Sequence, residues 1–316
     1  MSPLPELNKE SPIAVLAAGR LGSSLAIALS KADYNVAAVT SRQSSHRKWL
    51  SDQISNTIVV ENVQTAANVA SIVFITGPDA HIEEICSEVE WRSHQAVVHC
   101  AGVLPLAVLD EARIAGAETA GFHPLQTFPT NDSSERLKDV SFATESANPM
   151  LFYWLRLLAI DLGGSAFGIE SSQRAAYHAS AVMACGLLAG LTGLAAEMWE
   201  PLGIERSDAL RRLVPLLRAT VDALDEKGLP DAITGPFVRG DVETIATHLA
   251  ATSEKSPEIG QAYSALALAS LHIAEEQGGM SESKFESLKT LLSDENQTKN
   301  AHKNPKMGNN DLTQVN

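Results

Sequence analysis

The sequence has few cysteines, and this limits the kinds of protein that it can specify. Cys86, Cys100 and Cys185 are the only three in 316 residues, and each falls within an apolar run. So small and scattered a set provides neither a disulfide framework nor a zinc cluster. The nine histidines show no metal-ligand spacing either. We therefore expect buried free thiols and no bound metal.

Positive charge is also scarce. The chain has 24 Lys and Arg residues against 38 Asp and Glu residues, a formal net charge of −14, and no basic block. Nucleic acids and anionic membranes attract basic patches, so neither is an expected partner. The opening MSPLPELNKESP lacks a basic region followed by an apolar core, and no uninterrupted apolar stretch reaches bilayer-spanning length. We expect a cytoplasmic protein.

Hydrophobic residues make up 45% of the chain, enough for a sizeable core, and its length suggests two domains. Seven short strand-like runs alternate with helix-length segments, which predicts a doubly wound parallel α/β sheet. These runs are Ile13–Leu16, Asn35–Thr40, Ile72–Thr76, Ala96–His99, Thr119–His123, Val140–Thr144 and Ala166–Ile169.

The pattern changes from Ser172 onward, where the strand signals end. Ala/Leu-rich stretches at about 173–199, 206–227, 241–251 and 257–277 predict an all-helical second domain. After about Met280 the sequence turns polar, which predicts a disordered tail. The expected division is therefore residues 1–170 for the α/β domain, 171–280 for a helical substrate and dimerisation domain, and 281–316 for the tail.

The first predicted strand runs into the sequence AAGRLG and then into an amphipathic helix. This resembles the Gly-x-Gly-x-x-Gly fingerprint of Rossmann domains, with Ala17 in place of the first glycine. Gly19 would let the backbone approach a pyrophosphate, and Gly22 would let the helix pack on the strand. A tight turn with no ligand is the alternative. The residues expected to contact a dinucleotide here are Ala18, Gly19, Arg20, Leu21 and Gly22.

The end of the second strand indicates which dinucleotide is bound. NAD-binding proteins usually carry an acidic residue there for the ribose hydroxyls, whereas this strand runs into Ser41 and Arg42. A guanidinium and a hydroxyl suit a 2′-phosphate, so the cofactor is expected to be NADP(H). Gly77 and Pro78 follow the strand at 72–76 and are expected to line the same cofactor, although they also suit an ordinary turn.

Longer motifs add a family resemblance, which covers roughly residues 12–275. With AAGRLG, the chain has HCAG at 99–102, GFHPLQTF at 121–128, AAYHASAV at 175–182 and TGPFVRGDVETIATHL at 234–249. It resembles the Rossmann-like branch of the 6-phosphogluconate dehydrogenase superfamily, which has a helical C-terminal domain of poorly defined function. Relatives oxidise or reduce small hydroxy acids, imines and keto acids with NADP(H), and some resemble ketopantoate reductases. The resemblance implies that Cys100 and Ala101 also contact the cofactor.

Two histidines are candidates for proton transfer. His123 ends the predicted strand at 119–123, on the side of the sheet where the nicotinamide is expected, and Gln126 and Thr127 add substrate-binding groups close by. His178 is the first choice, because related dehydrogenases place a proton-transferring lysine on the first helix of the second domain; Tyr177 beside it is a substrate-binding candidate. Either histidine could instead be a hydrogen-bonded structural residue.

Arg239 lies in a loop that leads into a helix, and it is the expected receptor for a substrate carboxylate. It could instead pair with Asp241 and serve only structure. Together these residues predict an NADPH-dependent reductase of a small, ketopantoate-like oxo acid, working as a homodimer through its apolar helical domain.

Two alternatives remain open. Ala101 stands where the family often has serine, and Gly186 where it often has asparagine, which would suit a non-catalytic NADP(H)-binding sensor or partner protein. The His-Pro sequence at 123–124 also resembles that of prephenate and arogenate dehydrogenases, which would suit an imine or cyclic-acid oxidoreductase.

Overall fold

The computed structural model describes residues 4–301 of the chain, with side chains up to residue 293. The chain divides into two compact units, Met1–Gly186 and Leu187 onward. Helix α7 (Arg174–Val182), which we assigned to the second domain, therefore belongs to the first unit.

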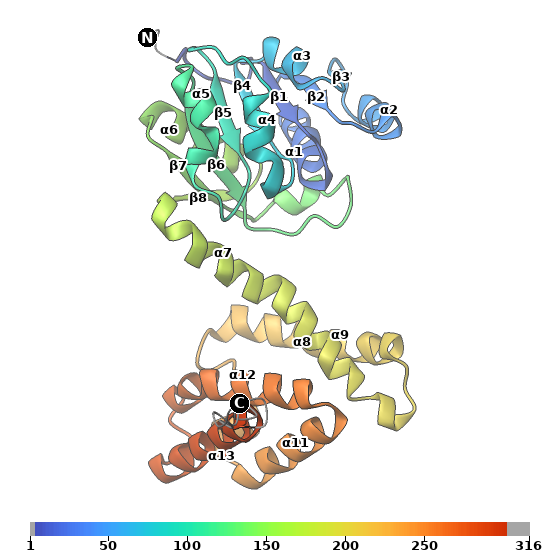
Figure 1. Ribbon diagram of the computed structural model, residues 1–316, viewed down its shortest axis with the longest axis vertical. Coiled ribbons are helices and arrows are strands. Elements are labelled where there is room, and N and C mark those ends of the chain that lie inside the picture. Colours follow the sequence, from blue (N-terminus) through green and yellow to red (C-terminus); the bar gives the residue numbers. More distant parts are fainter. Residues whose placement is uncertain (1–3, 302–316) are drawn as a thin grey trace, which may run out of the picture. The chain divides into compact units, whose positions relative to one another are not determined.

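The first unit is built on one eight-stranded sheet of order β3-β2-β1-β4-β5-β6-β7-β8 (Figure 1). Neighbouring strands are parallel, as expected, except β6 and β7, which are antiparallel and depart from the predicted parallel sheet. The predicted doubly wound fold is confirmed, and β3 is the strand that the sequence pattern missed. The strands are β1 (Ile13–Leu16), β2 (Val36–Thr40), β3 (Ile58–Val60), β4 (Ile72–Ile75), β5 (Ala96–His99), β6 (Glu118–Pro124), β7 (Ser141–Ser146) and β8 (Ser165–Gly168).

Alternate residues of each strand point to opposite faces of the sheet, so the unit has two hydrophobic cores. Ile13 and Val15 pack with α1 (Arg20–Lys31) and α6 (Pro149–Asp161) on one face. The other face packs against α3 (Val63–Asn68), α4 (Ile82–Ser87) and α5 (Asp110–Ile114). Helix α2 (Ser44–Gln53) follows β2.

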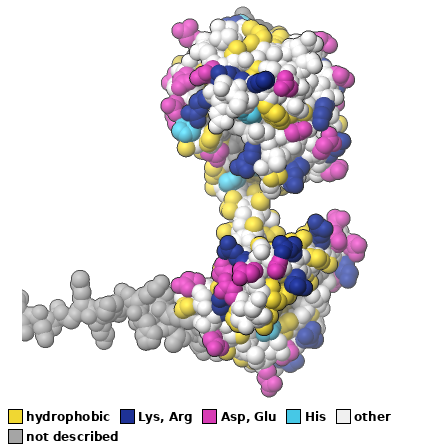
Figure 2. All heavy atoms as spheres, turned by 90° about the vertical axis from the view of Figure 1, so that its right-hand side faces the viewer, with side chains coloured by type: hydrophobic (Ala, Val, Ile, Leu, Met, Phe, Trp, Pro, Cys, Tyr) yellow, Lys and Arg dark blue, Asp and Glu magenta, His cyan; other side chains and the backbone are white. Residues whose placement is uncertain are grey.

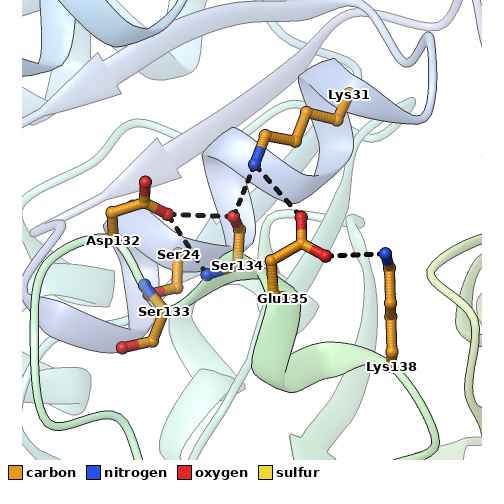
Figure 3. A network of polar contacts seen from close by, with 7 residues as sticks. All are labelled: Ser24, Lys31, Asp132, Ser133, Ser134, Glu135 and Lys138. Carbon is orange, nitrogen blue, oxygen red and sulfur yellow. Dashed lines mark hydrogen bonds and ion pairs between the residues drawn. The ribbon is translucent and has the colours of Figure 1, made fainter.

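The segment between β6 and β7 is held on α1 by a network of polar contacts (Figure 3). The backbone N–H of Ser133 donates to the Ser24 hydroxyl at 2.9 Å. Lys31 donates to the Ser134 hydroxyl at 3.0 Å and pairs with Glu135 at 3.3 Å. These contacts fix the segment after β6 to α1.

The second unit is all-helical over its described residues, as the sequence predicted. Its core contains Ile245, Leu249, Ala267 and Leu271. The helices that follow a π-helical turn (Met183–Leu187) are α8 (Leu188–Glu197), α9 (Arg206–Lys227), α10 (Pro236–Arg239), α11 (Val242–Lys255), α12 (Pro257–Glu276) and α13 (Glu282–Ala301).

The expectation of a disordered tail from residue 281 is wrong for α13. Leu288 and Leu292 of this helix are fully buried in the core of the second unit, and Phe285 packs against it. Apolar residues three and four apart form one helical stripe even when the overall composition is polar, so a polar composition does not exclude an ordered helix. Residues 302–316 lie outside the described part of the chain.

Ser171–Leu202 is one helical run with a mean hydropathy of 1.8 in its most apolar window, of which 11% is buried. By length and composition alone it could cross a membrane, contrary to our expectation that no stretch reaches that length. Among the described residues it is the one helix that meets this test. Cys185, in this run, is exposed rather than buried as expected, whereas Cys86 and Cys100 are buried.

Candidate functional site

The predicted cofactor residues meet at one edge of the sheet. Strands β1, β4, β5 and β6 are parallel, so the segments that follow them lie at the same carboxyl edge. Strand order reverses direction between β1 and β4, and such a point is where open α/β sheets bind ligands.

Ala17, in place of the first fingerprint glycine, takes a left-handed backbone with φ of 53°. A residue with a side chain reaches this conformation only at a cost, because the Cβ atom crowds the backbone. Its N–H donates to the Thr40 hydroxyl at 2.8 Å, which fixes the turn to the end of β2. The turn therefore has the shape that the fingerprint requires, although the glycine is missing.

The two fingerprint glycines that are present have different surroundings. A Cβ atom on Gly22 would lie 2.1 Å from the Thr76 hydroxyl oxygen, so only glycine allows α1 to approach β4 this closely. A Cβ atom on Gly19 would meet nothing within 4 Å, so the turn is open to solvent there. Helix α1 also begins without a side-chain cap. Free amides at an open helix start fit the pyrophosphate of a dinucleotide.

Ser41 and Arg42 follow β2, and their backbone is held by Arg47. One Arg47 nitrogen donates to the carbonyl oxygens of Ser41 and Arg42, both at 2.8 Å, and pairs with Glu61 at 3.0 Å. The Arg42 side chain is exposed. An anchored backbone that presents a free guanidinium fits a 2′-phosphate.

His46 is a residue of this region that sequence reasoning missed. Its ring nitrogens lie 3.0 Å from the Ser41 hydroxyl and 3.1 Å from the Ser23 hydroxyl on α1. Burial lowers the pKa of His46. The imidazole thus links the start of α1 to the loop after β2.

The two candidate histidines come together with Tyr177. Nδ1 of His123 and the Tyr177 hydroxyl share a hydrogen bond of 2.7 Å, and the His123 and His178 rings are 6.1 Å apart at 78°. A Cβ atom on Gly102 would lie 2.5 Å from the His178 ring and 3.0 Å from His123 Nε2. A glycine after β5 therefore leaves room for both imidazoles at the carboxyl edge of the sheet.

A row of three residues crosses the sheet beneath this group. His99 on β5 pairs with Gly121 on β6, and Gly121 pairs with Glu145 on β7. Paired residues point to the same face, so the missing side chain of Gly121 leaves a gap between His99 and Glu145. The guanidinium of Arg174 fills the gap, since a Cβ atom on Gly121 would lie 2.0 Å from its Nη2 atom.

Arg174 is fully buried and ion-paired. Its Nε atom lies 2.5 Å from Glu145 Oε2, and Nη1 donates to the Ala101 carbonyl oxygen at 3.1 Å. Two buried nitrogens of the described residues have no hydrogen-bond partner, Arg174 Nη2 and His99 Nε2. Each unpaired buried donor costs about 1–3 kcal/mol, which other interactions of the fold must offset.

Burial and the Arg174 charge keep the neighbouring imidazoles neutral. Burial first, then Arg174 and His123, lower the pKa of His99 to about 3. Burial, His178 and Arg174 lower the pKa of His123 to about 4. Burial raises the pKa of Tyr177 to about 12. At neutral pH, His123 and Tyr177 can therefore act only as uncharged donors or acceptors.

The remaining predicted site residues differ in exposure. Cys100 and Ala101 follow β5 and are buried. Burial raises the pKa of the Cys100 thiol to about 12, so the thiol stays protonated and is a poor nucleophile at neutral pH. Gln126 and Thr127 are exposed, and the Gln126 amide oxygen accepts from the Thr127 backbone N–H. In the second unit Arg239 is exposed and borders a cavity of about 400 Å³ with Lys284. His99, Glu145 and Arg174 were not predicted.

Two domain families match the chain. Residues 8–124 match the family described as a Rossmann-like domain, and residues 140–270 match a domain of unknown function (DUF2520). No curated protein matches. The chain thus carries a Rossmann-like domain followed by this second domain.

Many solved structures are similar. A Bacteroides fragilis protein described as a candidate NADP oxidoreductase shares 24% identity at a TM-score of 0.66, over 84% of this chain and 98% of that one. A reductive aminase from Aspergillus terreus in complex with NADPH shares 15% identity at a TM-score of 0.62, over 90% of this chain and 99% of that one. A 1-pyrroline-5-carboxylate reductase from Streptococcus pyogenes shares 18% identity at a TM-score of 0.57, over 81% of this chain and 100% of that one. At these identities the likeness establishes the fold.

Proposed function

We propose that this chain is an NADP(H)-dependent oxidoreductase that reduces a C=O or C=N bond of a small molecule. The observation that carries the proposal is the carboxyl edge of the sheet. An open turn follows β1, an anchored Ser41-Arg42 loop follows β2, and His123 near the end of β6 is hydrogen-bonded to Tyr177. The NADP oxidoreductases among the similar structures support the same conclusion.

When bound, the cofactor would supply a hydride. Gly19 and the start of α1 would hold its pyrophosphate, and Arg42 its 2′-phosphate. His178, which lies over Gly102 beside His123, is the proposed proton donor. His123, with its pKa lowered to about 4, would stay neutral at pH 7 and orient the substrate together with Tyr177.

The substrate that we propose first is a small oxo acid, ketopantoate-like, with Arg239 as the receptor for its carboxylate. One observation favours an imine as a second candidate. Arg174 is the cation beside His123, and its charge is already paired with Glu145. This group therefore offers uncharged donors, which also suit a substrate without a carboxylate.

Nucleotide binding tests the cofactor. NADPH is expected to bind more tightly than NADH, and Arg42→Ala should weaken NADPH at least about tenfold, because a hydrogen bond to a charged group contributes about 1.5–3 kcal/mol. Lys48→Ala, an exposed cation of α2, is the matched control. Equal binding of NADH, or an Arg42→Ala protein with unchanged NADPH affinity, would contradict the assignment.

Turnover tests the chemistry. Loss of absorbance at 340 nm with a panel of 2-oxo acids, cyclic imines and prephenate would distinguish the substrate classes. His178→Ala should reduce turnover by at least about tenfold while NADPH binding persists. A protein that binds NADPH but turns over nothing in the panel would favour the non-catalytic sensor.

We also propose that the protein is a cytoplasmic homodimer without a membrane or nucleic-acid partner. Arg174 and Tyr177, in the first turns of the helical run Ser171–Leu202, contact β7 and β6 of the first unit. Hydrophobic side chains lie open along the second unit (Figure 2). They include Leu187, Leu188, Leu191, Val214, Leu216, Val221 and Leu224.

A further inference from the structure

Arg174 occupies a position in α7 that links the sheet to the candidate proton-handling group. It is the first residue of the helix, and Tyr177 and His178 follow three and four residues later. Residues at these spacings lie on one face of an α-helix. The helix face that is tied to the sheet through Arg174 is therefore the face that presents Tyr177 and His178.

We infer that Arg174 is a positioning residue for the proposed active site: clamped between Glu145 and the Ala101 carbonyl oxygen, it sets the rotation of α7 that brings Tyr177 and His178 to His123. The significance of this site rests on the proposed function, but the geometry does not depend on it.

The contacts of the guanidinium support this role. An ion pair with Glu145 alone would join α7 to β7. The second contact, from Nη1 to the Ala101 carbonyl oxygen, joins the same side chain to the loop after β5, where the cofactor is proposed to bind. One planar group thus fixes the helix relative to two points of the sheet, which a single ammonium group cannot do with the same geometry.

Glu145 is itself held in place. Its Oε1 atom accepts from the Ser171 hydroxyl at 2.5 Å, and the Ser171 oxygen accepts from the Leu106 backbone N–H at 3.3 Å. The charged and titratable groups facing His123 are His99, Tyr177, His178 and Arg174. A shift of Arg174 should therefore change both the contact of Tyr177 with His123 and the titration of His123.

Two substitutions disturb the clamp in different ways. Arg174→Lys keeps the positive charge but loses the planar fork. Gly121→Ala keeps every charge but places a Cβ atom 2.0 Å from the present position of Nη2. Gly168→Ala is the matched control, because its Cβ atom in β8 would come no nearer than 3.4 Å to Phe152.

The test is histidine-resolved NMR on the full, ligand-free protein. In the wild type, cross-relaxation between the Tyr177 and His123 rings, 5.6 Å apart, should be visible, and His123 should stay neutral at pH 5.5. Arg174→Lys and Gly121→Ala should each lose the cross-relaxation and raise the pKa of His123 toward the usual value of about 6.5, while Gly168→Ala behaves as the wild type.

The inference is overturned if either variant folds and keeps both wild-type signals. It is also overturned if both variants fail to fold, since Arg174 would then be a requirement for folding. NADPH binding is measured in parallel: a wild type that binds no NADPH would contradict the proposed function and leave the NMR result unaffected.

Discussion

The carboxylate of Glu145 and the guanidinium of Arg174 form an ion pair at 2.5 Å whose arginine side chain has no exposed surface. They come from β7 and α7 and meet over Gly121, the residue that faces Glu145 across the sheet. A charge buried to this extent is tolerated because its partner is fixed beside it. Removing one partner leaves the other charge buried without a counter-ion, whereas replacing both partners by apolar residues leaves no buried charge.

The first prediction concerns the stability of this pair. Glu145→Ala should lower the free energy of unfolding by about 3–5 kcal/mol, because it leaves the Arg174 charge buried without a counter-ion. The double variant Glu145→Leu with Arg174→Met should lose distinctly less, since neither charge remains. Denaturant unfolding of the single and double variants measures this, and a double variant that is less stable than Glu145→Ala would contradict it.

The second prediction is a loss of stability in acid. The folded-state pKa values of His99 and His123, about 3 and about 4, lie below the usual value in an unfolded chain. The unfolded state thus binds more protons below about pH 6.5, so the stabilisation present above that pH is lost as pH falls, by up to about 1.4 kcal/mol per pH unit for each histidine.

Unfolding free energies measured between about pH 7 and about pH 4.5 should show this slope. His99→Asn or His123→Asn should each flatten it, whereas His81→Asn, an exposed histidine on the same unit, should not. A slope that is the same in all four proteins would show that other groups cause the acid sensitivity.

Much of the fold could be predicted because each signal is local. Four-residue runs such as Ile13–Leu16 and Ile72–Ile75 are fully buried strands bounded by turn residues. Strand β3 is only three residues long, and its burial is partial. The antiparallel direction of β7 was not predicted, because local sequence carries no signal of strand direction.

The site was predictable only in part, for a similar reason. The turn around Gly19 and the Ser41-Arg42 loop are each indicated by a few consecutive residues. The Arg174–Glu145 pair joins residues 29 positions apart, and nothing near either residue indicates the other. Gly121 in the middle of a strand was a usable signal, because a strand glycine often marks the close approach of another group.

The third prediction is that Ala17→Gly stabilises the protein. Ala17 has a φ of 53°, where glycine is at no disadvantage and a residue with a Cβ atom pays about 1–2 kcal/mol. After the extra chain entropy of glycine is subtracted, a net gain of roughly 0.5–1 kcal/mol is expected. Ala18→Gly, at the neighbouring buried alanine, should instead destabilise. Thermal or denaturant unfolding checks both, and a destabilised Ala17→Gly protein would show that the turn needs the methyl group.

The last prediction concerns the open apolar face of the second unit. Val214, Val221 and Leu224 of α9 recur at helical spacing and are 37%, 55% and 44% exposed, and Leu191 of α8 is 38% exposed. Such a stripe is typical of a surface that another helix covers, and we propose that a second copy covers it. The wild type should therefore sediment as a dimer at micromolar concentration.

Leu191→Glu together with Val221→Glu should give a folded monomer, because each glutamate would have to lose its water to enter the interface and neither replaces a buried side chain. Ile114→Glu is the matched control: this residue of α5 is 72% exposed and lies on the first unit. The control should remain a dimer. A wild type that sediments as a monomer would show that the stripe is covered within its own chain or by a different partner, whereas a double variant that stays dimeric would place the interface elsewhere.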